Sequence, residues 1–187
     1  MMAEIYGVAG SGKTTYVRKQ NRYHAINPGF FQKNLAFVRF LFMDLPLFLR
    51  HVFLIEGYNK KKIFFVIIYK LQLAEIMKKD SSKTHRIYDQ GPIYSLCRLL
   101  NKSSSAEHER IADLVDILIE RIKRVFDETI YINCDDQVAL QRVLNRDTSH
   151  MYKERDRESV MSDIAVWKKN FDYIHSRIDS RVIVNNN

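Results

Sequence analysis

The chain has 187 residues, of which 46% are hydrophobic and 28% are charged. This length fits a single domain of about 150 residues or slightly more, and the composition excludes a disordered, collagen-like or disulfide-stapled chain. Thirty Lys and Arg against 22 Asp and Glu give a net charge of +8. Such a charge is typical of proteins that bind nucleic acid, anionic membranes or small anions such as phosphates, although a solvated basic surface gives the same count.

The sequence carries no sign of a metal cluster, a signal peptide or a membrane span. Cys97 and Cys134 belong to no Cys/His ligand pattern, so a structural zinc site is not expected. Residues 35–55 are interrupted by charges and residues 63–69 are too short, because a spanning helix needs about 20 apolar residues. Residues 1–4 include neither a basic nor an apolar leader region. We therefore expect a cytoplasmic protein without a transmembrane segment.

The first half of the chain is expected to begin with a strand and to continue in helices. A short apolar run ending in glycine predicts a strand at residues 5–8, and a helix is expected over 13–23. Residues 30–55 are rich in Phe and Leu and contain one proline, which predicts two helices. Residues 62–79 predict another helix, because the apolar positions continue past 63–68, although that run alone also fits a buried strand.

The second half alternates strands with helices. The expected elements are, in chain order, a strand at 86–89, a helix over 106–126, a strand at 128–134, a helix through 138–144, a loop over 147–157, a helix over 160–174 and a strand at 181–184. Asp135 or Asp136 is expected to cap the helix that follows it. This alternation predicts an α/β fold with a mostly parallel sheet covered by helices on both faces. A fifth strand is expected near 51–55 or 63–68.

Residues 7–14, Gly-Val-Ala-Gly-Ser-Gly-Lys-Thr, match the phosphate-binding pattern G-x-x-x-x-G-K-[ST] at every fixed position. Glycines let successive backbone N–H groups turn toward one anion. The charge of Lys13 reaches the β- and γ-phosphates, and the Thr14 hydroxyl is a ligand for Mg²⁺. We therefore predict a nucleoside triphosphate site. Its expected ligands are Gly7, Ala9, Gly10, Ser11, Gly12, Lys13, Thr14 and Thr15.

Asp89 is the second candidate. It ends the predicted strand 86–89, and ligands bind at the carboxyl edge of open α/β sheets. A carboxylate there can hold a Mg²⁺-bound water or accept a proton from an acceptor hydroxyl. The alternative is an aspartate that only opens the turn before Pro92. Asp135 and Asp136 also follow a strand, but helix capping accounts for them.

The third candidate is a basic group late in the chain. Arg142 and Arg146 are four residues apart on one helix face, and the polar loop that follows contains Lys153, Arg155 and Arg157. Arginine forks stabilise the charge of a phosphoryl group in transfer, and a mobile loop that carries them can close over a nucleotide. The alternative is a solvated surface in which acidic residues of the same loop pair with these arginines.

With these three features in this order, the chain resembles the nucleoside monophosphate kinase-like group of P-loop kinases, which includes thymidylate, deoxynucleoside and shikimate kinases. Residues 87–92, Ile-Tyr-Asp-Gln-Gly-Pro, are similar to the Asp-Arg segment of thymidylate and deoxynucleoside kinases. Residues 138–147 look like the helix that leads into their lid. The resemblance implies one three-layer P-loop domain over 1–187, with a helical acceptor-binding region at 26–60 and a lid at 146–158.

The resemblance also implies roles for residues. The implied catalytic residues are Lys13, Asp89, Arg155 and Arg157, with Arg142 and Arg146 toward the nucleotide and Thr14 and Asp89 toward Mg²⁺. Gln90 stands where these kinases usually carry Arg, which favours a non-standard acceptor. Arg39, Arg50 and His51 either contact an anionic acceptor or lie on a helix surface. The expected core includes Phe30, Phe31, Phe37, Phe40, Phe42 and Phe48.

The predicted function is a kinase that uses ATP and Mg²⁺ to phosphorylate a small acceptor, namely a nucleotide, a nucleoside or a sugar-like metabolite. The alternatives are a P-loop switch or ATPase that acts on a macromolecule, and a degenerate nucleotide binder. The guanine-specific pattern Asn-Lys-x-Asp does not occur, which argues against a GTPase. Nucleic acid is not expected as a partner, because no platform of aromatic and basic residues is evident. The oligomeric state stays open, with a homodimer among the alternatives.

Overall fold

The computed structural model describes residues 1–20, 23–79, 85–145, 152 and 155–185. Its centre is a parallel five-stranded sheet with the strand order β2-β3-β1-β4-β5. The strands are β1 (Met2–Tyr6), β2 (Tyr23–Ala25), β3 (His85–Asp89), β4 (Glu128–Asn133) and β5 (Arg181–Val184). All five strands run in one direction, so their carboxyl ends meet along one edge of the sheet, as the alternation of strands and helices predicts.

Helices make up most of the remaining described residues. They are α1 (Lys13–Lys19), α2 (Phe30–Arg39), α3 (Leu45–Val52), α4 (Tyr58–Lys79), α5 (Pro92–Asn101), α6 (Ser105–Arg110), α7 (Ala112–Val125), α8 (Asp136–Leu144) and α9 (Arg157–His175), with a π-helical turn at Phe40–Asp44 between α2 and α3. Among the described residues, no helix has the length and hydrophobicity that crossing a membrane requires.

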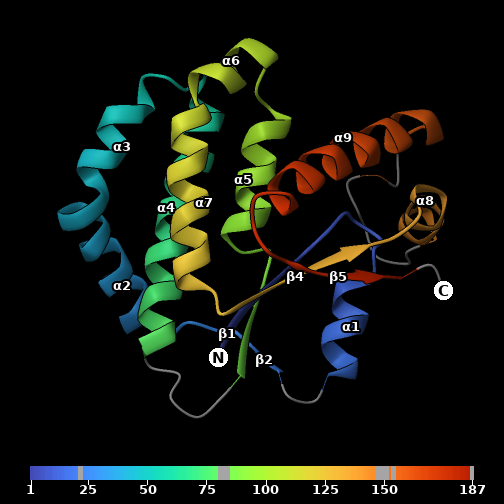
Figure 1. Cartoon of the computed structure of the whole chain (residues 1–187), viewed down its shortest axis with the longest axis horizontal. Coiled ribbons are helices and arrows are strands. Elements are labelled where there is room, and N and C mark those ends of the chain that lie inside the picture. Colours follow the sequence, from blue (N-terminus) through green and yellow to red (C-terminus); the bar gives the residue numbers. More distant parts are fainter. Residues whose placement is uncertain (21–22, 80–84, 146–151, 153–154, 186–187) are drawn as a thin grey trace.

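The sheet separates two apolar clusters, because side chains alternate between the faces of a strand. From β1, Met2 and Tyr6 belong to the larger cluster, which residues of α4, α5, α7 and α9 complete. Ala3 and Ile5 belong to the smaller cluster, against which Val17 of α1 packs. Figure 1 shows α1 on the opposite side of the sheet from α4, α5 and α7. The predicted covering of both faces by helices is confirmed.

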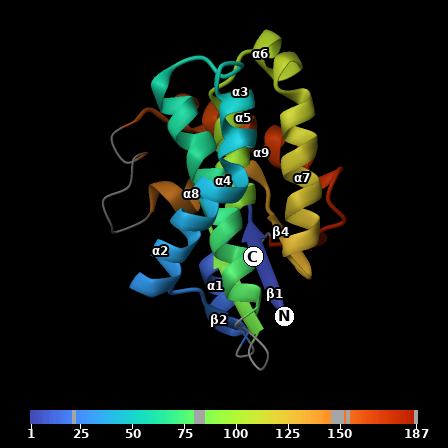
Figure 2. The ribbon, with the colours of Figure 1, turned by 90° about the vertical axis from the view of Figure 1, so that its left-hand side faces the viewer.

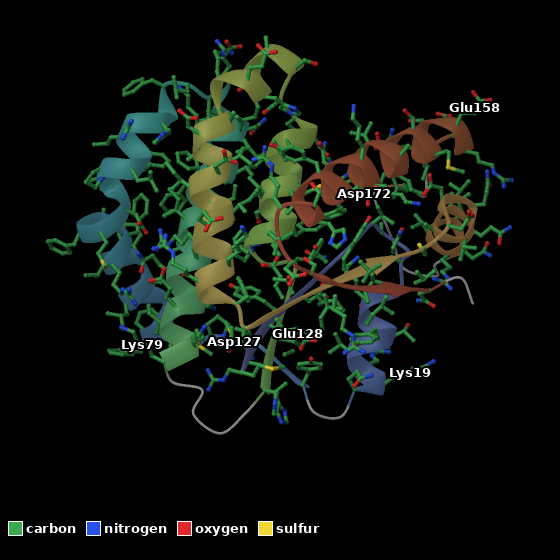
Figure 3. The ribbon with its side chains drawn as sticks, viewed as in Figure 1. Lys19, Lys79, Asp127, Glu128, Glu158 and Asp172 are labelled. Atoms are coloured by element: carbon green, nitrogen blue, oxygen red, sulfur yellow. The ribbon has the colours of Figure 1, made fainter. Side chains whose placement is uncertain are left out.

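The amino ends of the strands are held by charged and polar contacts of Asp127 and Glu128, which are labelled in Figure 3. The backbone N–H of Met2 donates to Asp127 at 2.8 Å, and the same carboxylate forms an ion pair with Lys78 of α4 at 2.6 Å. The Tyr23 hydroxyl of β2 donates to Glu128 at 2.6 Å. Acidic side chains therefore pin helices and strands together at this edge, and the loops at the opposite, carboxyl edge carry the candidate site.

The π-helical turn joins α2 to α3 with one residue more than an α-helical turn holds. The backbone N–H of Leu45 donates to the carbonyl of Phe40, five residues earlier. The turn ends at buried Asp44, which accepts hydrogen bonds from Gln72 of α4 at 2.6 Å and Arg121 of α7 at 2.7 Å. These contacts tie the start of α3 to two helices of the larger core.

The expectation that the phenylalanines of residues 30–48 lie in the core holds for only part of them. Phe40 is buried, and Phe48 stacks on Phe64 of α4 with ring centroids 5.3 Å apart. The exposed ones are Phe30, Phe31, Phe37 and Phe42. In Figure 2, α2 and α3 lie outside α4, so each of these helices offers only one face to the core.

The fifth strand lies elsewhere than the sequence suggests. α1 ends at Lys19, and β2 begins at Tyr23, within the helix predicted over 13–23. Its three residues are fixed by parallel pairing with β3, a long-range contact that local periodicity does not report. Residues 51–55 end α3 and form a turn, and residues 63–68 lie inside α4, so both expected positions were wrong. The helical reading of 62–79 is confirmed.

The first strand and two helical segments also differ from the prediction. The strand expected at 5–8 runs over Met2–Tyr6, because residues 7 and 8 already belong to the glycine-rich loop. The helix expected over 106–126 breaks at Ile111 into α6 and α7, and α6 begins after Ser104, whose hydroxyl accepts from the N–H of Glu107. No element was expected at α5, which begins at Pro92, a residue favoured in the first turn of a helix. Asp135 caps α8.

Candidate functional site

Residues 7–12 connect β1 to α1 at the carboxyl edge of the sheet. Gly10 and Gly12 adopt positive φ angles of 81° and 93°, which side-chain-bearing residues rarely adopt. A Cβ atom at Gly10 would also collide with the backbone of Ala139 in α8. Glycine is therefore required at position 10 by both backbone conformation and close packing, and the loop can follow the course that the phosphate-binding pattern predicts.

The Lys13 ammonium lies within this loop. It donates to the carbonyl of Gly7 at 2.9 Å and to the carbonyl of Val8 at 2.8 Å. The side chain is half-buried, so a full positive charge is held at the centre of the loop and remains within reach of solvent. This is the placement that phosphate binding requires.

Two polar side chains brace the loop from distant parts of the chain. Arg142 of α8 donates to the carbonyls of Gly10 at 3.1 Å and Asn185 at 3.4 Å. The Asn185 side chain, which follows β5, donates to the carbonyl of Ser11 at 2.8 Å. The structure thus brings Arg142 to the predicted loop, and the last strand supports it through Asn185.

Asp89 lies beside the same loop. In the parallel pairing of β1 with β3 it is the register partner of Ile5, two residues before Gly7. Its side chain is exposed and forms no hydrogen bond or ion pair with the described residues. An aspartate that opened the turn would bond to the backbone of the next residues. Asp89 makes no such contact with the described residues, and its role in the site stays a prediction.

These residues line a pocket of about 380 Å³, which we call the first pocket. Its lining comprises Val8, Ala9, Gly10, Gly12, Lys13, Thr14, Thr15, Asp89, Gln90, Tyr94, Arg142, Tyr152, Ile164 and Trp167. Thr14 and Asp89 offer oxygen atoms to it, and both side chains are exposed. A hard cation such as Mg²⁺ takes oxygen ligands and keeps several waters, so this donor set fits it. No cluster of three acidic, Cys or His side chains occurs among the described residues.

An aromatic wall of the first pocket was missed by the sequence reasoning. Tyr94 of α5 stacks on Trp167 of α9, with ring centroids 5.0 Å apart and planes inclined by 24°. Trp167 fits the apolar face of the last predicted helix, and nothing local shows that this face also reaches the pocket. Pro92 could have predicted the position of Tyr94, because proline is favoured in the first turn of a helix and this helix begins shortly after Asp89.

Glu4 of β1 supports the start of α5 through hydrogen bonds to its first backbone amides. It is fully buried in β1, and its Oε1 atom accepts from the backbone N–H groups of Ile93 at 2.8 Å and Tyr94 at 3.3 Å. Its Oε2 atom has no hydrogen-bond partner among the described residues. Burial raises the pKa of Glu4 to about 8, against the opposing effects of Lys70 and of the two amides. The carboxyl group is therefore mostly protonated at neutral pH.

This pKa predicts a pH dependence of stability. Because the folded protein holds the Glu4 proton more tightly than the unfolded chain, the contribution is complete below the usual pKa of 4.5 and is lost as pH rises to about 8. The slope reaches at most about 1.4 kcal/mol per pH unit. Urea unfolding between about pH 5 and 8 should show a decline in the wild type that Glu4→Gln reduces. Parallel profiles for the two proteins would contradict this assignment.

The turn between Asp89 and α5 is strained. Gln90 has a φ of 59°, a left-handed conformation that costs a non-glycine residue about 1 kcal/mol. Lys70 of α4 donates to the carbonyl of Gln90 and, at 2.9 Å, to the hydroxyl of Ser95. Strained residues held by their surroundings cluster at functional sites, and Gln90 lines the first pocket beside Asp89.

Several predicted site residues are not brought to the first pocket. Arg155 forms an ion pair with Asp163 of its neighbouring helix α9, and Arg157 donates to Gln137 at 3.4 Å. Arg146 and most of the predicted lid, 146–158, lie outside the described residues. A lid role for these arginines stays a prediction.

The three polar residues considered for acceptor contact in 30–55 also lie away from the site. Arg39 pairs with Glu75 at 2.9 Å, and buried His51 bonds to the carbonyl of Leu47 at 2.9 Å. Neither they nor Arg50 line the first pocket. The helix-surface alternative is therefore favoured for Arg39 and Arg50, whereas His51 is buried and fits neither alternative.

No family model matches this sequence, and no curated protein matches it either. Among solved structures, the chain is similar to deoxyadenosine kinase from M. mycoides with bound dATP, at a TM-score of 0.52 and 18% identity, over 100% of this chain and 91% of that one. The same enzyme with bound dCTP gives 0.50, and with the products dCMP and a flexible dCDP 0.51, both at 18% identity over 100% and 90% of the two chains. At this identity the likeness concerns the fold, and it confirms the predicted resemblance to P-loop kinases at that level.

Proposed function

We propose that this chain is a P-loop phosphotransferase that moves the γ-phosphoryl group of ATP to a small acceptor. The observation that carries the proposal is the first pocket, in which the glycine-rich loop, Lys13 and Asp89 face the same space. A cation beside a phosphate-binding loop, opposite a carboxylate at the end of a neighbouring strand, is the arrangement that phosphoryl transfer needs. The kinase fold of the similar structures, which hold dATP or dCTP, supports it.

The proposed reaction assigns a role to each group of the site, and Asp89 serves both the acceptor and Mg²⁺. The loop amides and Lys13 bind the β- and γ-phosphates, while Asp89 orients the acceptor hydroxyl and accepts its proton. The acceptor oxygen bonds to the γ-phosphorus as the bond to the bridging oxygen breaks, and ADP leaves. When bound, Mg²⁺ would neutralise charge on the phosphates, held through the oxygens of Thr14 and Asp89.

The domain organisation is part of this proposal. The whole chain, 1–187, forms one kinase-like domain, with an acceptor-binding region at 26–60 and a lid at 146–158. For Arg155 or Arg157 to act in the lid, each must exchange its present contact with Asp163 or Gln137 for the phosphates. Closure of a loop over bound substrate is a common route to such an exchange.

The test is ADP release from ATP and Mg²⁺ with a panel of acceptors, using the Lys13→Ala protein as the blank. The panel holds nucleosides, nucleoside monophosphates, sugars, sugar phosphates and hydroxy acids. We expect at least one acceptor to raise ADP release well above the blank. ATP binding without stimulation by any acceptor would favour the nucleotide-dependent switch or the degenerate binder.

A further inference from the structure

A second pocket opens between α4 and α5, beside the first. Its volume is about 390 Å³, within the range of small-ligand sites. Its lining comprises Asn59, Lys62, Ile63, Val66, Lys70, Gln90, Tyr94, Ser95, Arg98 and Lys102. Four of these side chains are cationic, and no Asp or Glu is among them. The pocket therefore favours ligands that carry negative charge.

Three of the four cations of this pocket are not compensated by an acidic side chain of the described residues. Lys62, Arg98 and Lys102 form no hydrogen bond or ion pair through their side chains with the described residues. By contrast, Lys60, two positions before Lys62 on α4, forms an ion pair with buried Glu107. Like charges held around one cavity repel each other, and an anion bound between them relieves that repulsion.

The positive charge around this pocket affects the pKa of Lys70. Burial lowers the pKa of Lys70, and the nearby charge of Arg98 lowers it further, while Glu4 acts in the opposite direction. Lys70 also holds the carbonyl of Gln90 and the hydroxyl of Ser95. Its ammonium thus fixes the turn that separates the two pockets.

The two pockets share Gln90 and Tyr94. Gln90 directly follows Asp89, whose carboxylate lies on the first pocket. A ligand anchored among the cations of the second pocket can therefore place another part of itself beside Asp89. This is the relation that an acceptor and the transferred phosphoryl group must have.

We propose that the second pocket binds the phosphoryl acceptor through an anionic group, a phosphate or a carboxylate, held by Lys62, Arg98 and Lys102. The inference rests on the proposed function and deepens it, because it names an anionic rather than a neutral acceptor. The anionic group serves as the anchor just beyond the proposed acceptor-binding region 26–60, of which Asn59 lines the pocket. The acceptor oxygen lies toward Asp89.

The test measures binding of matched ligand pairs by titration calorimetry. The pairs are a nucleoside with its 5′-monophosphate, a sugar with its phosphate, and the same sugar with its sugar acid, which separates phosphate from carboxylate. We expect the anionic member of at least one pair to bind about tenfold tighter or more. Lys62→Gln and Arg98→Gln should each weaken that binding by about tenfold and leave the neutral member unchanged.

Lys61→Gln is the matched control. Lys61 is the neighbour of Lys62 on α4 and does not line the pocket, so the same change of charge should alter anion binding by less than about twofold. Melting temperatures of the three variants identify any that unfold. If all three variants weaken binding equally, the effect is one of net charge and the inference is overturned.

ADP release with the same ligands separates this inference from the proposed function. Stimulation by anionic acceptors, reduced in Lys62→Gln and unchanged in Lys61→Gln, supports both. Equal stimulation by neutral acceptors, insensitive to Lys62 and Arg98, overturns the anionic acceptor and leaves the kinase. Charge-dependent anion binding without ADP release from any acceptor overturns the kinase, and with it the role of the bound anion as an acceptor.

Discussion

Replacing Lys13 with alanine is expected to lower ADP formation by about 10³-fold or more, through loss of charge stabilisation at the transferring phosphoryl group. The fold should persist. The ammonium donates to the loop carbonyls of Gly7 and Val8, and the side chain is half-buried, so the free energy of unfolding should fall by no more than about 2 kcal/mol. Steady-state kinetics and urea unfolding of the same preparation measure the two quantities.

Lys19→Ala is the control for this change. Lys19 ends α1, the helix that Lys13 begins, and its side chain is exposed away from the first pocket (Figure 3). Its loss should leave ADP formation within about twofold of the wild type. Full activity in Lys13→Ala would rule out the proposed mechanism, whatever the control shows.

Asp89→Asn is expected to lower kcat by about 10²- to 10⁴-fold while the dissociation constant for ATP changes by less than about threefold. Asparagine keeps the size of the side chain but can neither accept a proton nor offer a negative charge. Since the Asp89 side chain makes no hydrogen bond or ion pair with the described residues, stability should be unaffected. Single-turnover kinetics and equilibrium ATP titration separate chemistry from binding.

Asp179→Asn provides the same chemical change at an exposed residue remote from both pockets. We expect it to behave as the wild type in both measurements. If Asp89→Asn also turns over at the wild-type rate, Asp89 is only the residue before a turn, and the base must be sought elsewhere. A loss of ATP affinity as large as the loss of kcat would instead make Asp89 chiefly a ligand of the nucleotide complex.

The phosphate-binding loop could be predicted from the sequence because the residues that define it are adjacent in the chain. Residues 7–14 carry the glycines, the lysine and the threonine within one strand, turn and helix start, and the neighbouring strand end supplies Asp89. Four of the five strands were equally visible as short apolar runs. β2 was not, because only pairing with β3 gives its three residues their conformation.

The remainder of the site depends on packing between distant elements. Glu4 reads as a polar interruption of a strand, and only the fold shows that its carboxyl group receives the first amides of α5. The second pocket joins lysines of α4 to Arg98 and Lys102 across a helix pair. Periodicity assigns these cations to solvated helix surfaces, since it reports which face of a helix is apolar but not which two faces meet.

The π-helical turn at Phe40–Asp44 has a consequence for insertions and deletions in this chain. The extra residue it holds offsets α3 from α2 by about 100° around the helix axis. That offset aims Phe48 at Phe64 and Asp44 at Arg121. Deleting a single residue here would turn the apolar face of α3 away from α4, and Pro46 would still prevent a regular helix from running through. The length of this segment is therefore fixed to the residue, even where the identity of an exposed side chain is free to vary.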